Sequence, residues 1–237
     1  MEPQASPWIL PDAESADEHG LVGVGADLEP GTVLAAYRRG LFPMAVGDLL
    51  GWWSPDPRGV LPLDGLHISR SLRKSMRRYH VTVDTDFGGV LTGCADPSRD
   101  GGWIDTDIVV AYSRLFELGW AHSIEVRNDD DDLVGGLYGV AIGRFFAGES
   151  MFHYRTDASK VALAYLVAHL NKNGAALLDV QWRTDHLATL GVIEIDRRNY
   201  VSRVGAASAA TDVDLFGPNA KPPDFPTNTL KNTDGRT

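Results

Sequence analysis

The chain has 237 residues, of which 43% are hydrophobic and 23% are charged, and its formal net charge at pH 7 is -10. These values are ordinary for a soluble globular protein, and the acidic balance argues against broad, nonspecific nucleic-acid binding. A single cysteine, Cys94, excludes an internal disulfide, and the seven histidines show no metal-ligand spacing. We expect a cytoplasmic monomer with no metal, no cofactor, no signal peptide and no membrane span.

Residues 1–64 predict a small N-terminal domain. Its lead-in is rich in Pro, Asp and Glu, and Thr32 is expected to cap a short helix that Gly40 ends. Three prolines within "GWWSPDPRGVLPL" fix turns or extended backbone and exclude a long helix there. We place the domain boundary near residues 61–66, so that residues 65–205 form the main domain and residues 206–237 form a disordered tail.

Helical and strand patterns alternate along the main domain. The periodicity predicts helices over 69–79, 87–96, 105–119, 157–174 and 184–191, and strands over 80–86, 121–128, 132–143, 144–152, 174–181 and 192–201. Asp105 or Thr106 is expected to cap the third of these helices. The acidic run at residues 129–132 is expected to be a solvated turn between paired strands. Strands mixed with helices predict an α/β or α+β fold.

Five cations lie close together in "SRSLRKSMRRYH" and would occupy one face of a helix. They are Arg70, Arg73, Lys74, Arg77 and Arg78. One interpretation is a solvated helix surface whose partners lie in neighbouring acidic loops. The other is a track for nucleic-acid phosphates, which would position a backbone without recognising its sequence. A patch of this size suits a short stretch, such as the end of a tRNA.

Polar residues interrupt two apolar segments of the main domain. Asp179 and Gln181 stand two apart in "GAALLDVQWRTDHLATLG", and alternation along a strand would place both side chains on one face. Glu149 follows Gly148 in the apolar segment "FFAGESMFHY". A buried charge costs several kcal/mol unless it meets a partner or a ligand. These residues therefore form either satisfied polar bridges within the core or a functional site.

Several segments resemble the leucyl/phenylalanyl-tRNA–protein transferase family. The most specific are "WWSPDPR", "GESMF" and "DVQ" followed by "HLATLG", and the similarity extends in order from about residue 20 to residue 201. The resemblance implies an acetyltransferase-like (GNAT-like) main domain joined to the small N-terminal domain. It also implies an enzyme that moves Leu or Phe, and less well Met, from charged tRNA to proteins beginning with Arg or Lys. The new N-terminal residue would mark the product for N-degron proteolysis.

The resemblance also implies roles for individual residues. Gln181 would accept a hydrogen bond from the attacking amine, with Asp179 orienting and polarising it; alternatively, Asp179 would hold the α-amino group of the donor. Glu149 would contact the aminoacyl-adenosine end of the tRNA. Trp53 and Trp103 would stack near the terminal adenosine, whereas Trp52 would pack at the domain junction.

An apolar pocket for the donor side chain is implied as well. Its residues would be Leu137, Phe146, Met151, Leu163, Leu166 and Leu178, each of which could equally be a plain core residue. Two other functions stay open: an acetyl-CoA-dependent N-acetyltransferase and a noncatalytic tRNA-binding module. The first would need a pyrophosphate loop of the form (Q/R)-x-x-G-x-(G/A), and the sequence has no convincing copy of it. The second leaves Asp179 and Gln181 unexplained.

Overall fold

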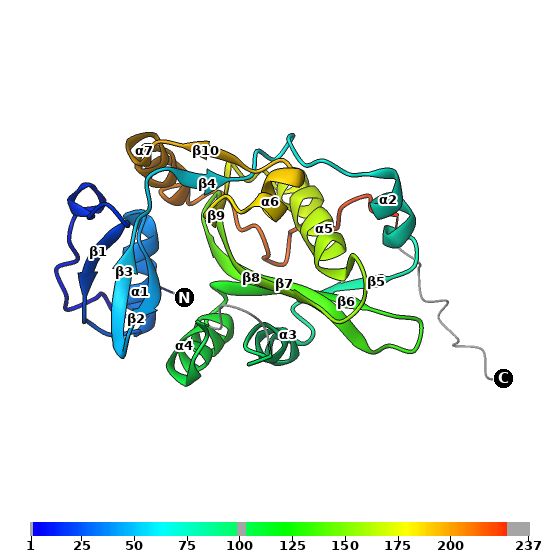
Figure 1. Ribbon diagram of the computed structural model, residues 1–237, viewed down its shortest axis with the longest axis horizontal. Coiled ribbons are helices and arrows are strands. Elements are labelled where there is room, and N and C mark those ends of the chain that lie inside the picture. Colours follow the sequence, from blue (N-terminus) through cyan, green and yellow to red (C-terminus); the bar gives the residue numbers. More distant parts are fainter. Residues whose placement is uncertain (1, 99–102, 227–237) are drawn as a thin grey trace.

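A small antiparallel sheet occupies one end of the molecule (Figure 1). The computed structural model describes residues 2–98 and 103–226. The small sheet has the order β1-β3-β2, formed by Leu21–Val24, Leu49–Trp53 and Phe42–Val46. Helix α1 (Pro30–Arg38) packs beside it and buries Val33, Leu34 and Tyr37. A short 3₁₀ helix, Ala13–Ser15, lies in the segment before β1.

A curved seven-stranded sheet forms the main body, in the order β10-β4-β9-β8-β7-β6-β5. Its strands are Ile193–Ile195, Arg58–Val60, Leu177–Gln181, Phe145–His153, Leu133–Ile142, Ala121–Arg127 and His80–Val83. Every neighbouring pair is antiparallel except β8 and β9. Those two strands pair only over residues 145–147 and 177–179, so beyond that point they separate.

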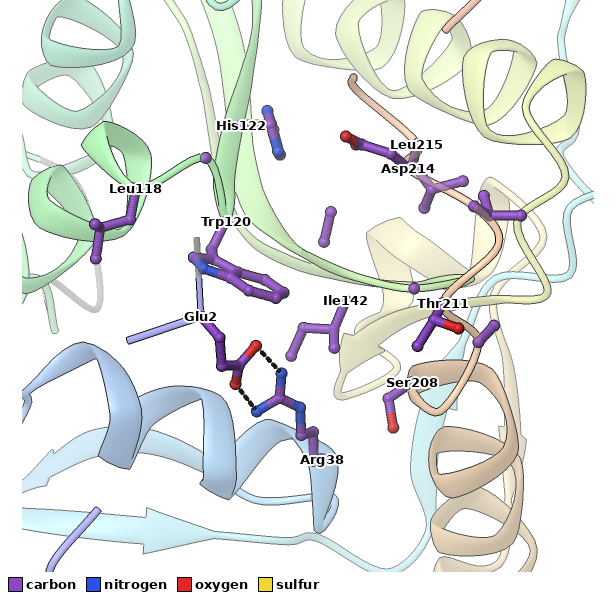
Figure 2. Close-up of a pocket in the computed structure, with 15 residues that line it drawn as sticks. Glu2, Arg38, Leu118, Trp120, His122, Ile142, Ser208, Thr211, Asp214 and Leu215 are labelled. Atoms are coloured by element: carbon purple, nitrogen blue, oxygen red, sulfur yellow. Dashed lines mark hydrogen bonds and ion pairs between the residues drawn. The ribbon is translucent and has the colours of Figure 1, made fainter. Parts of the chain in front are cut away.

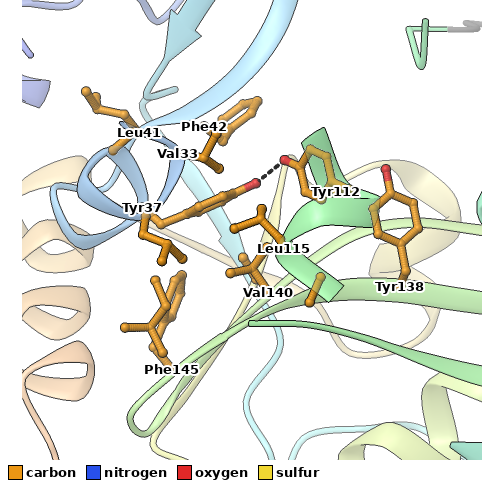
Figure 3. Close-up of a cluster of buried hydrophobic side chains, with 14 of the residues drawn as sticks. Val33, Tyr37, Leu41, Phe42, Tyr112, Leu115, Tyr138, Val140 and Phe145 are labelled. Atoms are coloured by element: carbon orange, nitrogen blue, oxygen red, sulfur yellow. Dashed lines mark hydrogen bonds between the residues drawn. The ribbon is translucent and has the colours of Figure 1, made fainter. Parts of the chain in front are cut away.

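Helices cover both faces of the large sheet (Figure 1). On one face lie α3 (Phe87–Cys94) and α4 (Thr106–Glu117), which is capped by Asp105 as predicted. On the other lie α5 (Ala158–Lys172), α2 (Arg70–Met76) and α6 (Asp185–Thr189). Two apolar clusters follow from this arrangement, one around Tyr37, Tyr112 and Phe145 (Figure 3) and the other beneath α5. The predicted α/β fold class is confirmed.

Strand β4 connects the two sheets. It follows β3 of the small sheet after four residues, yet it pairs with β9 and β10 in the large sheet. All three of its residues are buried, including Arg58. Residues 58–60 therefore belong structurally to the large sheet, a few residues before the boundary that the sequence suggested.

Three local predictions differ from the structure. Helix α1 begins at Pro30 after Glu29, so Thr32 lies within its first turn and is not its cap. The strand expected over residues 192–201 ends at Ile195, because the Asp196 side chain accepts a hydrogen bond from the Asn199 amide and caps helix α7 (Arg197–Ser208). The helix expected over residues 69–79 ends at Met76.

The segment after α7 packs on the main domain as far as the structure describes it. Leu215 is buried, the Phe216 ring stacks on His122 with centroids 4.1 Å apart, and Phe225 contacts Tyr165 edge to face at 5.1 Å. The disordered tail predicted from residue 206 is therefore ordered up to residue 226, since its apolar side chains are buried against α5 and the sheet. Residues 227–237 lie outside the described part.

No helix in the described ranges is long and apolar enough to cross a membrane. Within the same ranges, no group of three or more His, Cys, Asp or Glu side chains could hold a metal ion.

Candidate active site

The opening between β8 and β9 contains an apolar cavity of about 100 Å³. Most of the residues that line it come from these two strands, from β7 and from α5. Five of the six predicted pocket residues line it, together with Glu149 and Gln181; they are Leu137, Met151, Leu163, Leu166 and Leu178. Phe146 does not line it, and its buried ring packs against Phe216 instead.

A second cavity, of about 240 Å³, adjoins the first and shares Glu149, Val180, Gln181 and Leu187 with it. Aromatic and apolar side chains line the rest, among them Phe42, Met44, Trp103 and Trp182. Trp103 thus lines the same cavity as Glu149 and Gln181. Trp53 lies outside both cavities, and its indole nitrogen donates to the Met44 carbonyl oxygen at 3.0 Å. Trp52 is buried in the N-terminal unit and donates to the Gly25 carbonyl oxygen.

Asp179 is completely enclosed and has no free oxygen. The Arg58 guanidinium donates to both carboxylate oxygens, at 2.8 and 2.7 Å, and both side chains are 0% exposed. The Tyr200 hydroxyl donates to Oδ2 at 2.9 Å. Phe42 and Tyr200 lie against the guanidinium, with ring centroids 4.7 and 4.3 Å from Cζ. With both oxygens held by Arg58 and Tyr200, this buried carboxylate is closed to a substrate.

Gln181 lies at the end of β9 with an unusual backbone. Its φ of 57° lies in the left-handed region, which costs a residue other than glycine about 1–3 kcal/mol. The Asp179 Oδ1 atom accepts its amide hydrogen at 3.0 Å and so holds this conformation in place. The left-handed turn directs the Gln181 side chain to the wall between the two cavities. The prediction that Asp179 and Gln181 share one face assumed regular strand alternation, which does not apply at a residue with left-handed backbone.

Glu149 is the second carboxylate at the site, and it lies on β8 in the wall shared by the two cavities. Gln181 Nε2 donates to its Oε1 at 3.3 Å, and the Tyr112 hydroxyl donates to Oε2 at 3.0 Å. Burial raises the pKa of Glu149 to about 7, and the hydrogen bonds from nearby tyrosine hydroxyls oppose that rise. The Tyr112 hydroxyl is in turn hydrogen-bonded to that of Tyr37 (Figure 3).

The five predicted cations are exposed on and after α2. Among the described residues, none of the five forms an ion pair, so the expected acidic partners in neighbouring loops are not present. The opposite side of α2 buries Leu72 and Met76, and the Ser75 hydroxyl donates to Asp157 at the start of α5 at 2.8 Å. Helix α5 also carries Leu163 and Leu166, so one helix connects the cationic surface with the apolar cavity.

Another cavity, of about 310 Å³, lies away from these residues, between the turn before β6, the end of β7 and the segment after α7 (Figure 2). It contains none of the predicted site residues. Its cation, Arg38, is held by the Glu2 carboxylate at 2.7 and 3.1 Å and lies 5.5 Å from the centre of the Trp120 ring. With its charge already paired, this cavity is a weaker candidate for chemistry than the wall that holds Glu149 and Gln181.

Sequence reasoning missed the buried partners of the two carboxylates. Arg58 stands in the segment "WWSPDPR", and a cation just before the apolar run "GVLPL" is a signal that could have identified it. Tyr200 lies in the part of a predicted strand that forms helix α7 instead. Tyr37 and Tyr112 come from the N-terminal unit and from α4, and no spacing in the sequence relates them.

The chain matches the family of leucyl/phenylalanyl-tRNA protein transferases over residues 60–205, and the N-terminal domain of the same family over residues 26–56. A leucyl/phenylalanyl-tRNA–protein transferase from Aromatoleum aromaticum is 50% identical over 206 residues, which cover 82% of this chain and 86% of the relative. One from Escherichia coli O157:H7 is 48% identical over 195 residues, covering 81% and 83%.

Among solved structures, a GCN5-related N-acetyltransferase from Kribbella flavida is 12% identical, with a TM-score of 0.35 over 70% of this chain and 60% of that one. A likeness of this size establishes neither function nor ligand.

An α/β chain with this sequence similarity is an aminoacyltransferase. It belongs to the leucyl/phenylalanyl-tRNA protein transferase family.

Proposed function

We propose that the protein transfers Leu or Phe, and less well Met, from charged tRNA to the N-terminal Arg or Lys of acceptor proteins. The observation that carries this proposal is the apolar cavity whose wall ends in Glu149 and Gln181, in a chain of this family. The aminoacyl ester is already activated, so its aminolysis needs no further energy source. The new N-terminal Leu or Phe would then direct the product to N-degron proteolysis.

The donor side chain occupies the apolar cavity. Leucine residues from β7, β9 and α5 line it, so an aliphatic or aromatic side chain is accepted, and a polar side chain would lose its water without finding a partner. The adjoining cavity with Trp103 accommodates the terminal adenosine, since an aromatic face stacks on a base without selecting it. Glu149 faces the aminoacyl-adenosine end from the wall between them.

Gln181 receives a hydrogen bond from the attacking amine. Its Nε2 donates to Glu149, which leaves the side-chain carbonyl oxygen to accept from a substrate. Asp179 is a positioning residue: it is enclosed by Arg58 and Tyr200 and acts by holding the Gln181 backbone. Holding the amine against the ester carbonyl supplies much of the rate enhancement, because an α-amino group with a pKa of about 7.7–8.0 is partly neutral at cellular pH.

The exposed cations on and after α2 hold phosphates of the tRNA. Arg70, Arg73, Lys74, Arg77 and Arg78 carry charges that no acidic side chain in the described part of the chain neutralises. Like charges on one face repel each other, and bound phosphates would remove that repulsion. These contacts position the acceptor end of the tRNA and do not recognise its sequence.

The transfer assay mixes the purified protein with Leu-tRNA and a peptide that begins with Arg, beside a peptide that begins with Gly. We expect Leu to be added to the first peptide only. Addition to both, or to neither, would contradict the proposal. Acetyl-CoA in place of Leu-tRNA tests the acetyltransferase alternative, and binding of tRNA without any transfer would indicate a noncatalytic module.

The cationic surface is tested by the salt dependence of Leu-tRNA binding. Replacing Arg73 and Lys74 together with Gln should lower the slope of log K against log salt by about 0.7–0.9 for each phosphate that the variant no longer neutralises. Arg198 on α7, which pairs with Glu14 at 3.2 Å, offers a matched control. If Arg198→Gln had the same effect per charge removed as the double variant, net charge, and not this surface, would determine binding.

A further inference from the structure

Glu149 occupies a position from which it can meet both substrates. It lines the apolar cavity and the aromatic one, and with Val180, Gln181 and Leu187 it forms the wall between them. If the aminoacyl group lies across this wall, as the proposed function requires, the ester carbonyl passes close to Glu149. Asp179, by contrast, lines neither cavity and has both oxygens engaged.

The hydrogen bonds of Glu149 leave it able to exchange a proton. The Gln181 carboxamide donates to Oε1 and the Tyr112 hydroxyl donates to Oε2. A hydrogen bond from the Tyr37 hydroxyl also lowers the pKa of Glu149. A carboxylate has about four lone-pair sites, so one remains for a substrate proton. The bond to Nε2 also fixes the Gln181 amide, whose carbonyl oxygen can then hold the amine that is about to lose that proton.

The electrostatic surroundings of Glu149 bring its pKa close to neutral pH. The titratable and charged groups that face it come from six elements, and they are Tyr37, Arg58, Tyr112, Tyr138, Asp179 and Tyr200. Burial is the main cause that raises the pKa of Glu149 to about 7. Hydrogen bonds from the hydroxyls of Tyr37 and Tyr112 oppose this rise, and so does the charge of Arg58. The charge of Asp179 adds to the rise. A group that titrates near the working pH can both accept and return a proton.

We propose that Glu149 is a further catalytic residue of the transfer reaction: it takes the proton of the attacking amine and delivers it to the departing ribose oxygen. This inference rests on the proposed function, because it requires the aminoacyl ester to lie at the wall between the cavities.

The step balances without a co-reactant. The nitrogen lone pair of the neutral amine forms the C–N bond, and the carbonyl π electrons move to the oxygen of the tetrahedral intermediate. One N–H proton passes to the Glu149 carboxylate. When the carbonyl re-forms, the C–O bond to the ribose breaks, the ribose oxygen keeps the electron pair, and it receives the proton from Glu149. The carboxylate is thereby restored and a ribose hydroxyl is released.

The test measures single-turnover transfer from bound Leu-tRNA to an Arg-initiated peptide, as a function of pH, for the wild type and Glu149→Gln. In the wild type, both the amine and Glu149 must be deprotonated, so below about pH 6.5 the log rate should rise with a slope of two. In Glu149→Gln the slope should fall to one, because only the amine still titrates. Above pH 8, the rate of Glu149→Gln should be about 10²–10⁴-fold lower than the wild-type rate, because this is the usual contribution of a general base.

Three controls separate catalysis from folding and binding. Glu149→Gln should bind a nonreactive leucyl-amide analogue of adenosine within twofold of the wild type, and Glu149→Asp should retain a slope of two at a reduced rate. Glu125→Gln changes a fully buried glutamate that is hydrogen-bonded by Thr82 and Thr85 and lines neither cavity, and this variant should transfer normally.

The outcomes are distinct. A slope of two and a wild-type rate in Glu149→Gln would overturn the assignment of Glu149 while leaving the proposed function intact. A loss of analogue binding as large as the loss of rate would also overturn it, because Glu149 would then act in binding. Absence of transfer by the wild type itself would overturn the proposed function and this inference together.

Discussion

Two carboxylates stand close to the same wall of the site, and their surroundings differ in one respect. Asp179 is bound by a guanidinium in a two-pronged ion pair, which engages both of its oxygens. Glu149 meets a tyrosine hydroxyl and a carboxamide, and within the described residues no cation forms an ion pair with it. The cation engages both oxygens of Asp179 and makes it a structural anchor, whereas the donors to Glu149 among the described residues are neutral and burial raises its pKa to about 7.

The largest expected effect on stability comes from removing Arg58, the cation that pairs with Asp179. Arg58→Met should lower the free energy of unfolding by about 3–5 kcal/mol, because it leaves Asp179 buried without its counter-charge. Urea denaturation measures the loss. The double variant Arg58→Met/Asp179→Leu should recover much of it, since an apolar pair can replace a buried ion pair. If the double variant were less stable than Arg58→Met, the ion pair would not be the source of the loss.

The next test uses the pH dependence of stability. Glu149 has its pKa raised from 4.5 to about 7 in the folded protein, so the folded state binds more protons than the unfolded state between these pH values. Its contribution to stability is fully present below pH 4.5 and is lost as the pH rises through 7. Relative to Glu149→Gln, which does not titrate there, the wild type should lose about 3 kcal/mol between about pH 4 and pH 8.

Parallel unfolding curves of the two proteins across that pH range would contradict this prediction. Such a result would mean that burial does not raise the pKa of Glu149, and the comparison between the two carboxylates would fail.

A smaller effect on stability should distinguish Tyr112, which hydrogen-bonds to Glu149, from Tyr138, whose hydroxyl has no hydrogen-bond partner among the described residues. Tyr112→Phe removes the hydroxyl that binds Oε2 and should cost about 1–3 kcal/mol, because a buried acceptor loses its donor. Tyr138 is the matched control: its hydroxyl is buried without a hydrogen-bond partner in the described part of the chain. Tyr138→Phe should therefore be neutral or stabilising by up to about 1 kcal/mol. Thermal unfolding measures the stability of both variants. If Tyr112→Phe and Tyr138→Phe changed the free energy of unfolding equally, the hydrogen bond to Glu149 would not contribute to stability.

Local patterns in the sequence predict most of the elements that form the site, because strand alternation and helix caps depend on near neighbours. They predict the strands that carry Glu149 and Gln181 and the helix that carries Leu163. The strand predicted through Tyr200 is wrong because the cap supplied by Asp196 outweighs an alternating pattern of only a few residues.

The partners of the two carboxylates could not be predicted from spacing. Arg58 meets Asp179 across 121 positions, and Tyr37 meets Tyr112 across 75. Such pairs depend on how β4 inserts beside β9 and how α1 meets α4, which are properties of the tertiary fold. The left-handed backbone of Gln181 likewise follows from its contact with Asp179 and not from the preference of glutamine itself.

Because the chain passes from β3 of the small sheet directly into β4 of the large one, with Arg58 as the first residue of β4, the two halves of the protein are not exchangeable modules. A chimera that joined this catalytic half to a foreign N-terminal half after residue 60 would inherit whatever residue the donor sequence supplied opposite Asp179. We therefore expect a functional chimera at that junction only where the incoming half brings an arginine in the same register.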